Sequence, residues 1–298
     1  MREDTRRPLP ASGPRVFDVI CAGEALLHVA EPEGPFVTRT AALRLRPGGG
    51  AVSTALALAQ QGLYVGLATA LNDDTVSRKL VERIAAAGVD VGGVSLGPSR
   101  TGIVFVEGTG PTQNLVAYRD DGAPSVVPSG WSSRVLLISG LSPVVAQGAA
   151  LCKAARAARR TGSVVVMDLN ARRSRWADHD PRVIRSVIRE ADVIRCSTAD
   201  LAVLATNAVA LRALLAPSAV LVLRDGTGAA WASGPFGEVA RAARPTDARR
   251  SLGSGDVFTA AICAELSRVG SAVGDRPDLW DRALQRAQAA VQARALNA

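Results

Sequence analysis

The stretch Ser251-Leu252-Gly253-Ser254-Gly255-Asp256-Val257-Phe258 lies directly before a helical pattern over residues 259–267. Two glycines at a helix start let the backbone approach a ligand closely, and the free N–H groups there favour an anion. The Asp256 carboxylate would lie in the first helical turn, where it could accept a proton from a hydroxyl while the amides stabilise a transferring phosphoryl group. The residues alone leave a second interpretation open, in which Asp256 only stabilises the helix dipole after a glycine-rich turn.

Around this stretch, short β-branched runs alternate with longer helical patterns. The predicted strands cover residues 18–21, 64–68, 135–139, 164–168, 193–196 and 220–223. The predicted helices cover residues 51–61, 76–87, 144–160, 181–191 and 200–215. Continuous apolar strands between helices predict an α/β fold in which helices cover both faces of a mainly parallel sheet.

Two stretches, near residues 31–45 and 101–118, break this rhythm because they alternate apolar and polar residues between turns. They are interpreted as short antiparallel strands of a small accessory sheet that acts as a lid. Residues 1–15 are polar and contain prolines, which predicts a flexible N-terminal tail. No long linker divides residues 16–298, so these residues are predicted to form one domain that includes the lid segments.

Composition and charge bound the class of protein. The chain has 298 residues, of which 48% are hydrophobic and 21% charged, so disorder of the whole chain is excluded. The formal net charge is +8, carried almost entirely by arginine, because Lys79 and Lys153 are the only lysines. A basic balance suits anionic ligands. The charges are spread along the chain without a basic stripe, however, so no nucleic-acid partner is expected.

The same composition argues against several other environments. No apolar run approaches the roughly 18 residues of a membrane span, and the N-terminus has no apolar signal segment, so a cytoplasmic protein without a membrane partner is expected. The four cysteines are far apart and form no CxxC pair. With only two histidines beside them, a zinc site is not expected.

Two further motifs lie at places where α/β folds bind ligands. Gly48-Gly49-Gly50-Ala51-Val52-Ser53 opens a predicted helix, and Asp168-Leu169-Asn170-Ala171-Arg172 ends a predicted strand. Polar residues after a parallel strand point into the crevice of the sheet, where Asn170 could orient a hydroxyl and Arg172 could hold an anion bidentately. Taken alone, the first motif also fits a flexible turn before a capped helix, and the second a solvated strand end.

Known nucleotide and hydrolase motifs are absent. The chain has neither a GxxxxGK[ST] phosphate loop nor a GxSxG nucleophile elbow, and no GxGxxG is followed by an acidic residue about 20 positions later.

In their order along the chain, these motifs resemble the PfkB (ribokinase-like) family of carbohydrate kinases. Gly48-Gly49 followed by Ala55 resembles the first signature of that family, and Gly253-Ser254-Gly255-Asp256 resembles the second. The resemblance implies a three-layer α/β sandwich with a β-sheet lid, with residues 16–298 as the kinase domain. It also implies ATP as phosphoryl donor, Mg²⁺ as cofactor, Asp256 as catalytic base and an anion hole made by the backbone amides of residues 253–256.

Within the family, the chain is most similar to 2-keto-3-deoxygluconate kinases and fructokinases. Residues 168–172 with Trp176 are similar to the D-x-N-x-R…W stretch of those enzymes, and Tyr118-Arg119 resembles an aromatic–arginine pair that meets sugar acids. Two arginines suit a carboxylate substrate. Tyr118-Arg119 also fits a surface pair on a lid strand. The resemblance further implies a sugar or sugar-acid substrate and allows pairing of two lids into a homodimer.

The resemblance assigns three sets of site residues beside the 253–256 turn. The implied substrate-binding residues are Gly48, Gly49, Ser53, His28, Tyr118, Arg119, Asn170 and Arg172. The implied nucleotide-binding residues are Ser197, Arg224, Gly226 and Gly228. Asp200 is the implied magnesium-associated residue, acting through water.

Several residues depart from the family pattern. Arg250 stands where the family usually has an Asp that helps bind a monovalent cation, and Ser53 replaces a frequent Asn. His28 stands in place of a common Asp, Asp200 in place of Glu, and Ala229 in place of a glycine. These departures leave two alternatives open. One is a kinase for a nucleoside, an aminosugar or another specialised hydroxyl compound, and the other is a catalytically impaired sensor that binds sugar or nucleotide.

Overall fold

The strands of the chain form two sheets in the computed structural model, which describes residues 15–30, 43–97, 100–107, 114–118, 126–171, 181–243 and 253–296. The large sheet contains β1 (Arg15–Gly23), β4 (Val65–Asn72), β5 (Val89–Gly97), β8 (Trp131–Ser139), β9 (Val164–Asp168), β10 (Val193–Ser197), β11 (Val220–Arg224), β12 (Ala230–Gly234) and β13 (Gly237–Arg241). Its strand order is β13-β12-β11-β10-β9-β8-β1-β4-β5, and the pairings from β5 to β11 are all parallel. The predicted mainly parallel sheet is confirmed.

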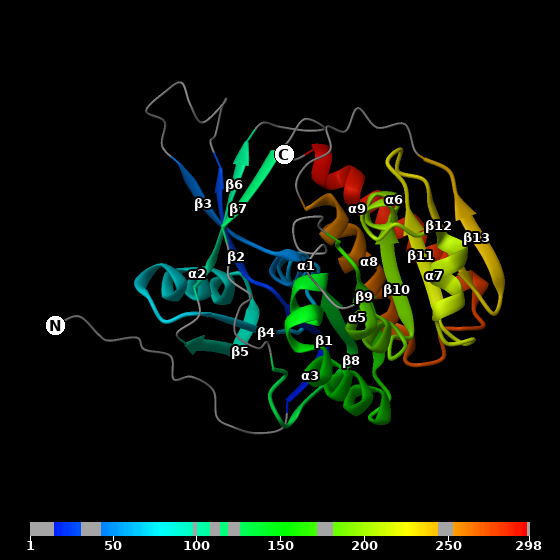
Figure 1. The fold of residues 1–298 in the computed structure, drawn as a ribbon, viewed down its shortest axis with the longest axis horizontal. Coiled ribbons are helices and arrows are strands. Elements are labelled where there is room, and N and C mark those ends of the chain that lie inside the picture. The colour runs from blue at the N-terminus through cyan, green and yellow to red at the C-terminus, as the bar shows by residue number, and fades with distance from the viewer. Residues whose placement is uncertain are drawn as a thin grey trace.

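Helices cover both faces of the large sheet (Figure 1). They are α1 (Gly50–Ala59), α2 (Thr75–Ala86), α3 (Leu141–Arg160), α5 (Pro181–Ile188), α6 (Thr198–Val203), α7 (Ala208–Leu214), α8 (Ser254–Val269) and α9 (Pro277–Leu296). Alternate residues of β1 enter different cores: Val19 packs with residues of α1, α8 and α9, whereas Ile20 packs with residues of α3, α5 and α7. The central strands are therefore apolar on both faces, which explains their continuous hydrophobic pattern. No helix in the described ranges has the length and apolar character needed to cross a membrane.

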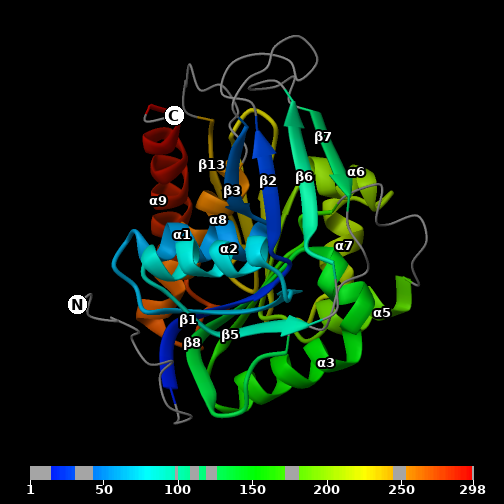
Figure 2. The same ribbon diagram turned by 90° about the vertical axis from the view of Figure 1, so that its left-hand side faces the viewer.

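The small sheet contains β2 (Leu26–Ala30), β3 (Arg44–Gly48), β6 (Gly102–Glu107) and β7 (Asn114–Tyr118), in the order β3-β2-β6-β7. Figures 1 and 2 show this sheet projecting away from the large sheet. Its outer pairs are antiparallel, as predicted, but β2 and β6 are parallel, which corrects the expectation of antiparallel strands alone. The reason is that β2 follows β1 and β6 follows β5, and β1 and β5 run in the same direction within the large sheet.

Three other expectations are corrected or fall outside the described residues. The single helix predicted over 200–215 is wrong, because Ala205 has a positive φ of 48° and the Asn207 side chain caps a new helix, α7. The antiparallel edge strands β12 and β13 were not predicted. Of the predicted lid segment 31–45, only residues 43–45 are described, and the predicted tail lies almost wholly outside the described residues.

Gly49 joins the small sheet to α1 and occupies a conformation that side chains rarely adopt. It precedes α1 with φ 93° and ψ 146°, and a Cβ built on it would lie 2.2 Å from the backbone oxygen of Glu24. This close approach holds the start of α1 against the chain that links β1 to β2. A side chain at Gly49 would therefore push the start of α1 away from the linker between β1 and β2.

We predict that Gly49→Ala lowers the free energy of unfolding by at least about 2 kcal/mol, since it combines backbone strain with a clash against backbone. Gly62→Ala is the matched control, because Gly62 also has a positive φ (81°) but nothing lies within 4 Å of a Cβ there. The control should lose about 1 kcal/mol from strain alone. Urea unfolding of both variants measures the difference, and equal losses would contradict the role given to the Glu24 contact.

Candidate active site

The N-terminus of α8 forms the turn that the sequence singled out. Gly253 has a left-handed φ of 85° and precedes α8, and its carbonyl accepts the first helical bond, from Val257 N at 3.0 Å. Asp256 lies in the first turn. A Cβ on Gly253 would lie 3.3 Å from Nη2 of Arg294 and 3.6 Å from Oδ2 of Asp256, so a carboxylate and a guanidinium both border this turn. Glycine is required here by its φ and by these neighbours.

Gly50 is the point at which four distant segments meet. A Cβ on Gly50 would lie 2.3 Å from Ser139 Oγ, 2.8 Å from Asn170 Nδ2 and 3.5 Å from Asp256 Oδ1. These groups come from the end of β8, the residue pair after β9 and the first turn of α8. In addition, the Thr54 hydroxyl of α1 donates to the backbone oxygen of Asp256 at 3.5 Å. The glycine motif, the D-x-N motif and the 253–256 turn are therefore brought together.

Asp200 joins β10, α6 and the segment after β9. Ser197 and Asp200 form a capping box, in which Asp200 Oδ2 accepts from Ser197 N at 2.7 Å and from Ser197 Oγ at 2.6 Å. Asp200 Oδ1 accepts from the backbone N–H of Ala171 at 2.6 Å. The carboxylate is buried, and donors occupy both oxygens. Its remaining lone pairs fit a magnesium ion through water rather than by direct ligation.

The wider donor set agrees with this limited role in metal binding. Within the described residues there is no group of three or more His, Cys, Asp or Glu side chains that could hold a metal ion. A magnesium ion bound mainly by substrate phosphates and water needs only one or two protein carboxylates. The single Asp200 carboxylate would suit such an ion, through water.

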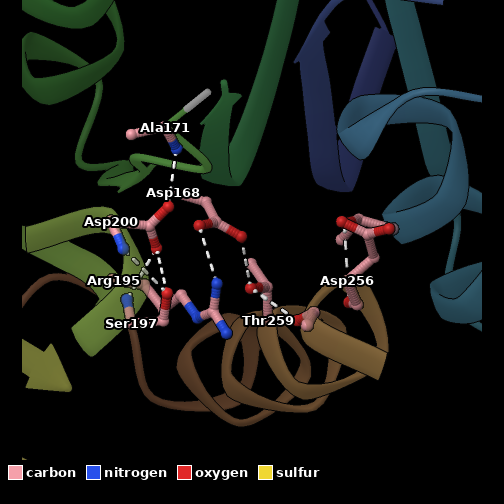
Figure 3. A network of polar contacts seen from close by, with 9 residues as sticks. Asp168, Ala171, Arg195, Ser197, Asp200, Asp256 and Thr259 are labelled. Atoms are coloured by element: carbon pink, nitrogen blue, oxygen red, sulfur yellow. Dashed lines mark hydrogen bonds and ion pairs between the residues drawn. The ribbon is translucent and has the colours of Figure 1, made fainter. Parts of the chain in front are cut away.

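Arg195, Asp168 and Thr259 form a buried network beside the turn (Figure 3). Arg195 Nη1 donates to Asp168 Oδ1 at 3.1 Å, and the Thr259 hydroxyl donates to Asp168 Oδ2 at 2.6 Å. Burial lowers the pKa of Arg195, but the charges of Asp168, Asp200 and Asp256 raise it, and the net shift is upward. Arg195 therefore stays charged inside the protein. Figure 3 shows Asp256 on the far side of Thr259 from Asp200.

A pocket of about 230 Å³ opens between these elements. It brings together Ser197, Arg224 and Gly226 of the implied nucleotide set with the implied anion-hole residues Ser254 and Gly255. Asn170, Arg195 and Asp200 also line it. Gly228 does not line the pocket, since it lies in the turn before β12, where its N–H donates to Asp225 Oδ1 at 2.9 Å.

The implied substrate residues have different positions. Gly48 ends β3, and a Cβ there would lie 2.3 Å from the ring of His28, which therefore packs on the Gly48 backbone. Ser53 lies in the first turn of α1, where its N–H donates to Gly49 O at 2.8 Å. Tyr118 is 64% exposed on β7 and contacts Phe105 edge-on, which fits a surface residue as well as one that a ligand covers.

Four residues that the resemblance to the family singled out cannot be placed in the site. Arg119, Arg172, Trp176 and Arg250 are outside the described residues. Their roles remain predictions.

Sequence reasoning missed Arg195 and Thr259. Arg195 interrupts an otherwise apolar strand, and the strand register pairs it with Asp168 on β9. A charge inside a buried strand is a signal that could have found it, because buried charges need partners. Thr259 gave no signal, since threonine is common in helices that face a core.

A family model described as "pfkB family carbohydrate kinase" matches residues 16–297. The chain belongs to the pfkB family. The resemblance inferred from the sequence motifs is thereby confirmed. Among curated proteins, a 5-dehydro-2-deoxygluconokinase of Geobacillus kaustophilus is 30% identical to this chain over 148 residues. The matched region covers 46% of this chain and 44% of that protein. The match thus spans less than half the length of that relative.

Solved structures support the fold over a longer range. A PfkB protein from Polaromonas sp. JS666 has a TM-score of 0.70 at 25% identity, covering 95% of this chain and 99% of that one. A fructokinase from Xylella fastidiosa with bound ATP has a TM-score of 0.78 at 19% identity, covering 93% and 92% of the two chains. The latter shows likeness of fold alone.

We predict that stability falls as pH drops through the range of His28. Burial lowers the pKa of His28 below its usual 6.5, so the folded protein favours the neutral ring. Below about pH 6.5, His28 binds a proton more readily in the unfolded chain than in the folded protein. The contribution of neutral His28 to the free energy of unfolding is therefore complete above that pH and is lost as the pH falls. Urea unfolding at pH 7.5 and 5.5 should show a smaller loss for His28→Asn than for the wild-type chain. Equal losses would contradict the assignment.

Proposed function

We propose that this pfkB-family chain is an ATP-dependent sugar kinase that transfers the terminal phosphate of ATP to a primary hydroxyl of a sugar or sugar acid, with Asp256 as base. One observation carries the proposal. The Asp256 carboxylate lies in the first turn of α8, near Asn170 and Ser139, and the pocket lined by Ser254 and Gly255 begins at the same turn. An acceptor near Asp256 and a phosphate group near Ser254 and Gly255 would therefore both lie at the N-terminus of α8, close enough to react.

In the proposed reaction the acceptor hydroxyl lies against Asp256. As the new O–P bond forms and the bond between the terminal phosphorus and the ADP oxygen breaks, the hydroxyl proton passes to the Asp256 carboxylate. Backbone N–H groups of residues 253–256, at the start of α8, stabilise the charge on the transferring group. Proton removal is late in such reactions, so most of the rate enhancement comes from holding the two reactants in line. This positioning can lower the activation barrier by roughly 7–11 kcal/mol.

Residues of the pocket would hold the nucleotide phosphates. Arg224 supplies a guanidinium, and Ser197 lines the pocket at the start of α6. Gly226 has no side chain, so a phosphate group can approach the backbone there closely. A magnesium ion, when bound with ATP, neutralises phosphate charge during transfer. Asp200 would orient one of its water ligands through an oxygen lone pair, while its bonds to Ser197 and Ala171 keep the carboxylate in place.

We further propose a sugar acid of the 2-keto-3-deoxygluconate type as acceptor. The 5-dehydro-2-deoxygluconokinase match supports an acid of this class, although it covers less than half of each chain. Asn170 and Asp256 both lie close to Gly50, so Asn170 could orient the acceptor hydroxyl. Gly48 and Ser53 flank Gly50 in the chain, and His28 of β2 packs on Gly48. Arg119 and Arg172 are the proposed carboxylate ligands. Two alternatives are separated by the tests below. One is a kinase for a nucleoside, an aminosugar or another specialised hydroxyl compound, and the other is a catalytically impaired sensor that binds sugar or nucleotide.

We also propose that residues 16–298 act as one kinase domain whose small sheet covers the acceptor. The same sheet is the proposed surface for a homodimer. In its register, Leu45 and Val116 lie at the two ends of a row whose middle residues, Val29 and Phe105, pack in the main core. Leu45, Val116 and Tyr118, on the outer strands, are exposed. Exposed apolar side chains that lie close together are typical of an interface between subunits.

We predict that Asp256→Asn lowers kcat by about 100-fold or more, since the variant lacks the base but keeps the shape of the side chain. Nucleotide affinity should stay within about threefold of wild type, measured by titration calorimetry with ATP and magnesium. Asp278→Asn is the control, because Asp278 is an exposed carboxylate at the start of α9, paired with Arg282. Near-wild-type turnover by Asp256→Asn would refute the assignment of the base.

We predict that an acceptor panel of sugar acids, ketohexoses, pentoses and nucleosides, assayed for ADP release, gives the highest kcat/KM with a keto-deoxy sugar acid. Preference for a nucleoside or aminosugar would contradict the sugar-acid proposal and favour the alternative kinase. Binding of nucleotide without transfer to any acceptor would favour the sensor.

A further inference from the structure

The side chain of Arg195 is held beside the first turn of α8. A Cβ on Gly255 would lie 3.3 Å from Arg195 Nη2 and 3.5 Å from Nη1. The side chain is only 7% exposed, and the ring of Phe258 lies 5.7 Å from its guanidinium carbon. A buried cation thus contacts the helix turn that the proposed function assigns to the transferring phosphate.

This position is electrostatically unusual. The N-terminus of a helix carries partial positive charge, so a cation beside it is unfavourable unless anions compensate. Asp168 compensates in part, through its bond to Nη1, and Thr259 fixes the other oxygen of Asp168. A helix terminus and a charged side chain that both attract anions therefore face the same small space.

The guanidinium is not saturated by these contacts. It has five N–H donors. Among the described residues its hydrogen bond is to Asp168, and its buried Nε has no partner. Arg195 also lines the 230 Å³ pocket together with Arg224, Ser254 and Gly255. Donors of a fixed, charged group are thus available at the pocket wall.

We propose that Arg195 is a phosphate-binding residue of this site: its guanidinium contacts the phosphate chain of the nucleotide in the pocket, and the link to Asp168 and Thr259 fixes it against α8. The inference rests on the proposed function and adds a residue to it. The amides of the 253–256 turn then hold the phosphate from one direction and Arg195 from another. The alternative role for Arg195 is structural, as the counter-ion that keeps buried Asp168 stable.

The test compares binding of a non-hydrolysable ATP analogue with binding of AMP, both with magnesium, by titration calorimetry. Arg195→Met should weaken analogue binding by about 10- to 100-fold, as expected for loss of a charged hydrogen bond, and change AMP binding by less than about threefold. Arg195→Lys keeps the charge without the planar fork, so it should bind the analogue with intermediate affinity and lower kcat without raising the acceptor KM. Arg241→Met is the control, since Arg241 pairs with Asp281 and does not line the pocket.

A double variant separates binding from folding, because Arg195→Met alone leaves Asp168 buried without its counter-ion. Asp168→Asn combined with Arg195→Met should regain thermal stability but not analogue affinity. Recovery of both, or analogue binding by Arg195→Met equal to wild type, would overturn the inference while leaving the kinase proposal intact. If the wild-type chain binds the analogue but phosphorylates no acceptor, the kinase proposal fails, and weak analogue binding by the variants still supports the role of Arg195.

Discussion

The absence of side chains at Gly49 and Gly50 is the constraint on which the site depends. Gly49 lets the start of α1 contact the Glu24 carbonyl, and Gly50 leaves room for Ser139, Asn170 and Asp256. A single methyl group at either position would overlap atoms that are already in place. Close packing of backbone, and not any one strong bond, therefore assembles the floor of the site from four segments of the chain.

The layered α/β core could be predicted from the sequence because strands covered on both faces are continuously apolar. The pairings at the edges could not be predicted in the same way. The parallel pairing of β2 with β6 depends on β1 and β5 running in the same direction, which only the assembled sheet determines. The break between α6 and α7 depends on a positive φ at Ala205, a residue type that normally favours helix.

The candidate site also contains some residues that the sequence indicated and others that it did not. The sequence motifs indicated Asn170 and Asp256 as candidate site residues, and both lie close to Gly50. The interactions that support them are between distant residues, such as Arg195 of β10 with Asp168 of β9 and Thr259 of α8. Spacing along the chain contains no information about such partners, because strand order and register bring them together.

The connection between the two sheets has a mechanical consequence. β2 continues from β1 through a linker whose Glu24 carbonyl lies against Gly49. Gly49 directly precedes α1, whose Thr54 hydroxyl donates to the backbone oxygen of Asp256. A tilt of the small sheet that displaces this linker would press on Gly49, immediately before α1. If the small sheet covers an acceptor as proposed, its closure would therefore also shift Thr54 and the first turn of α8 that carries Asp256.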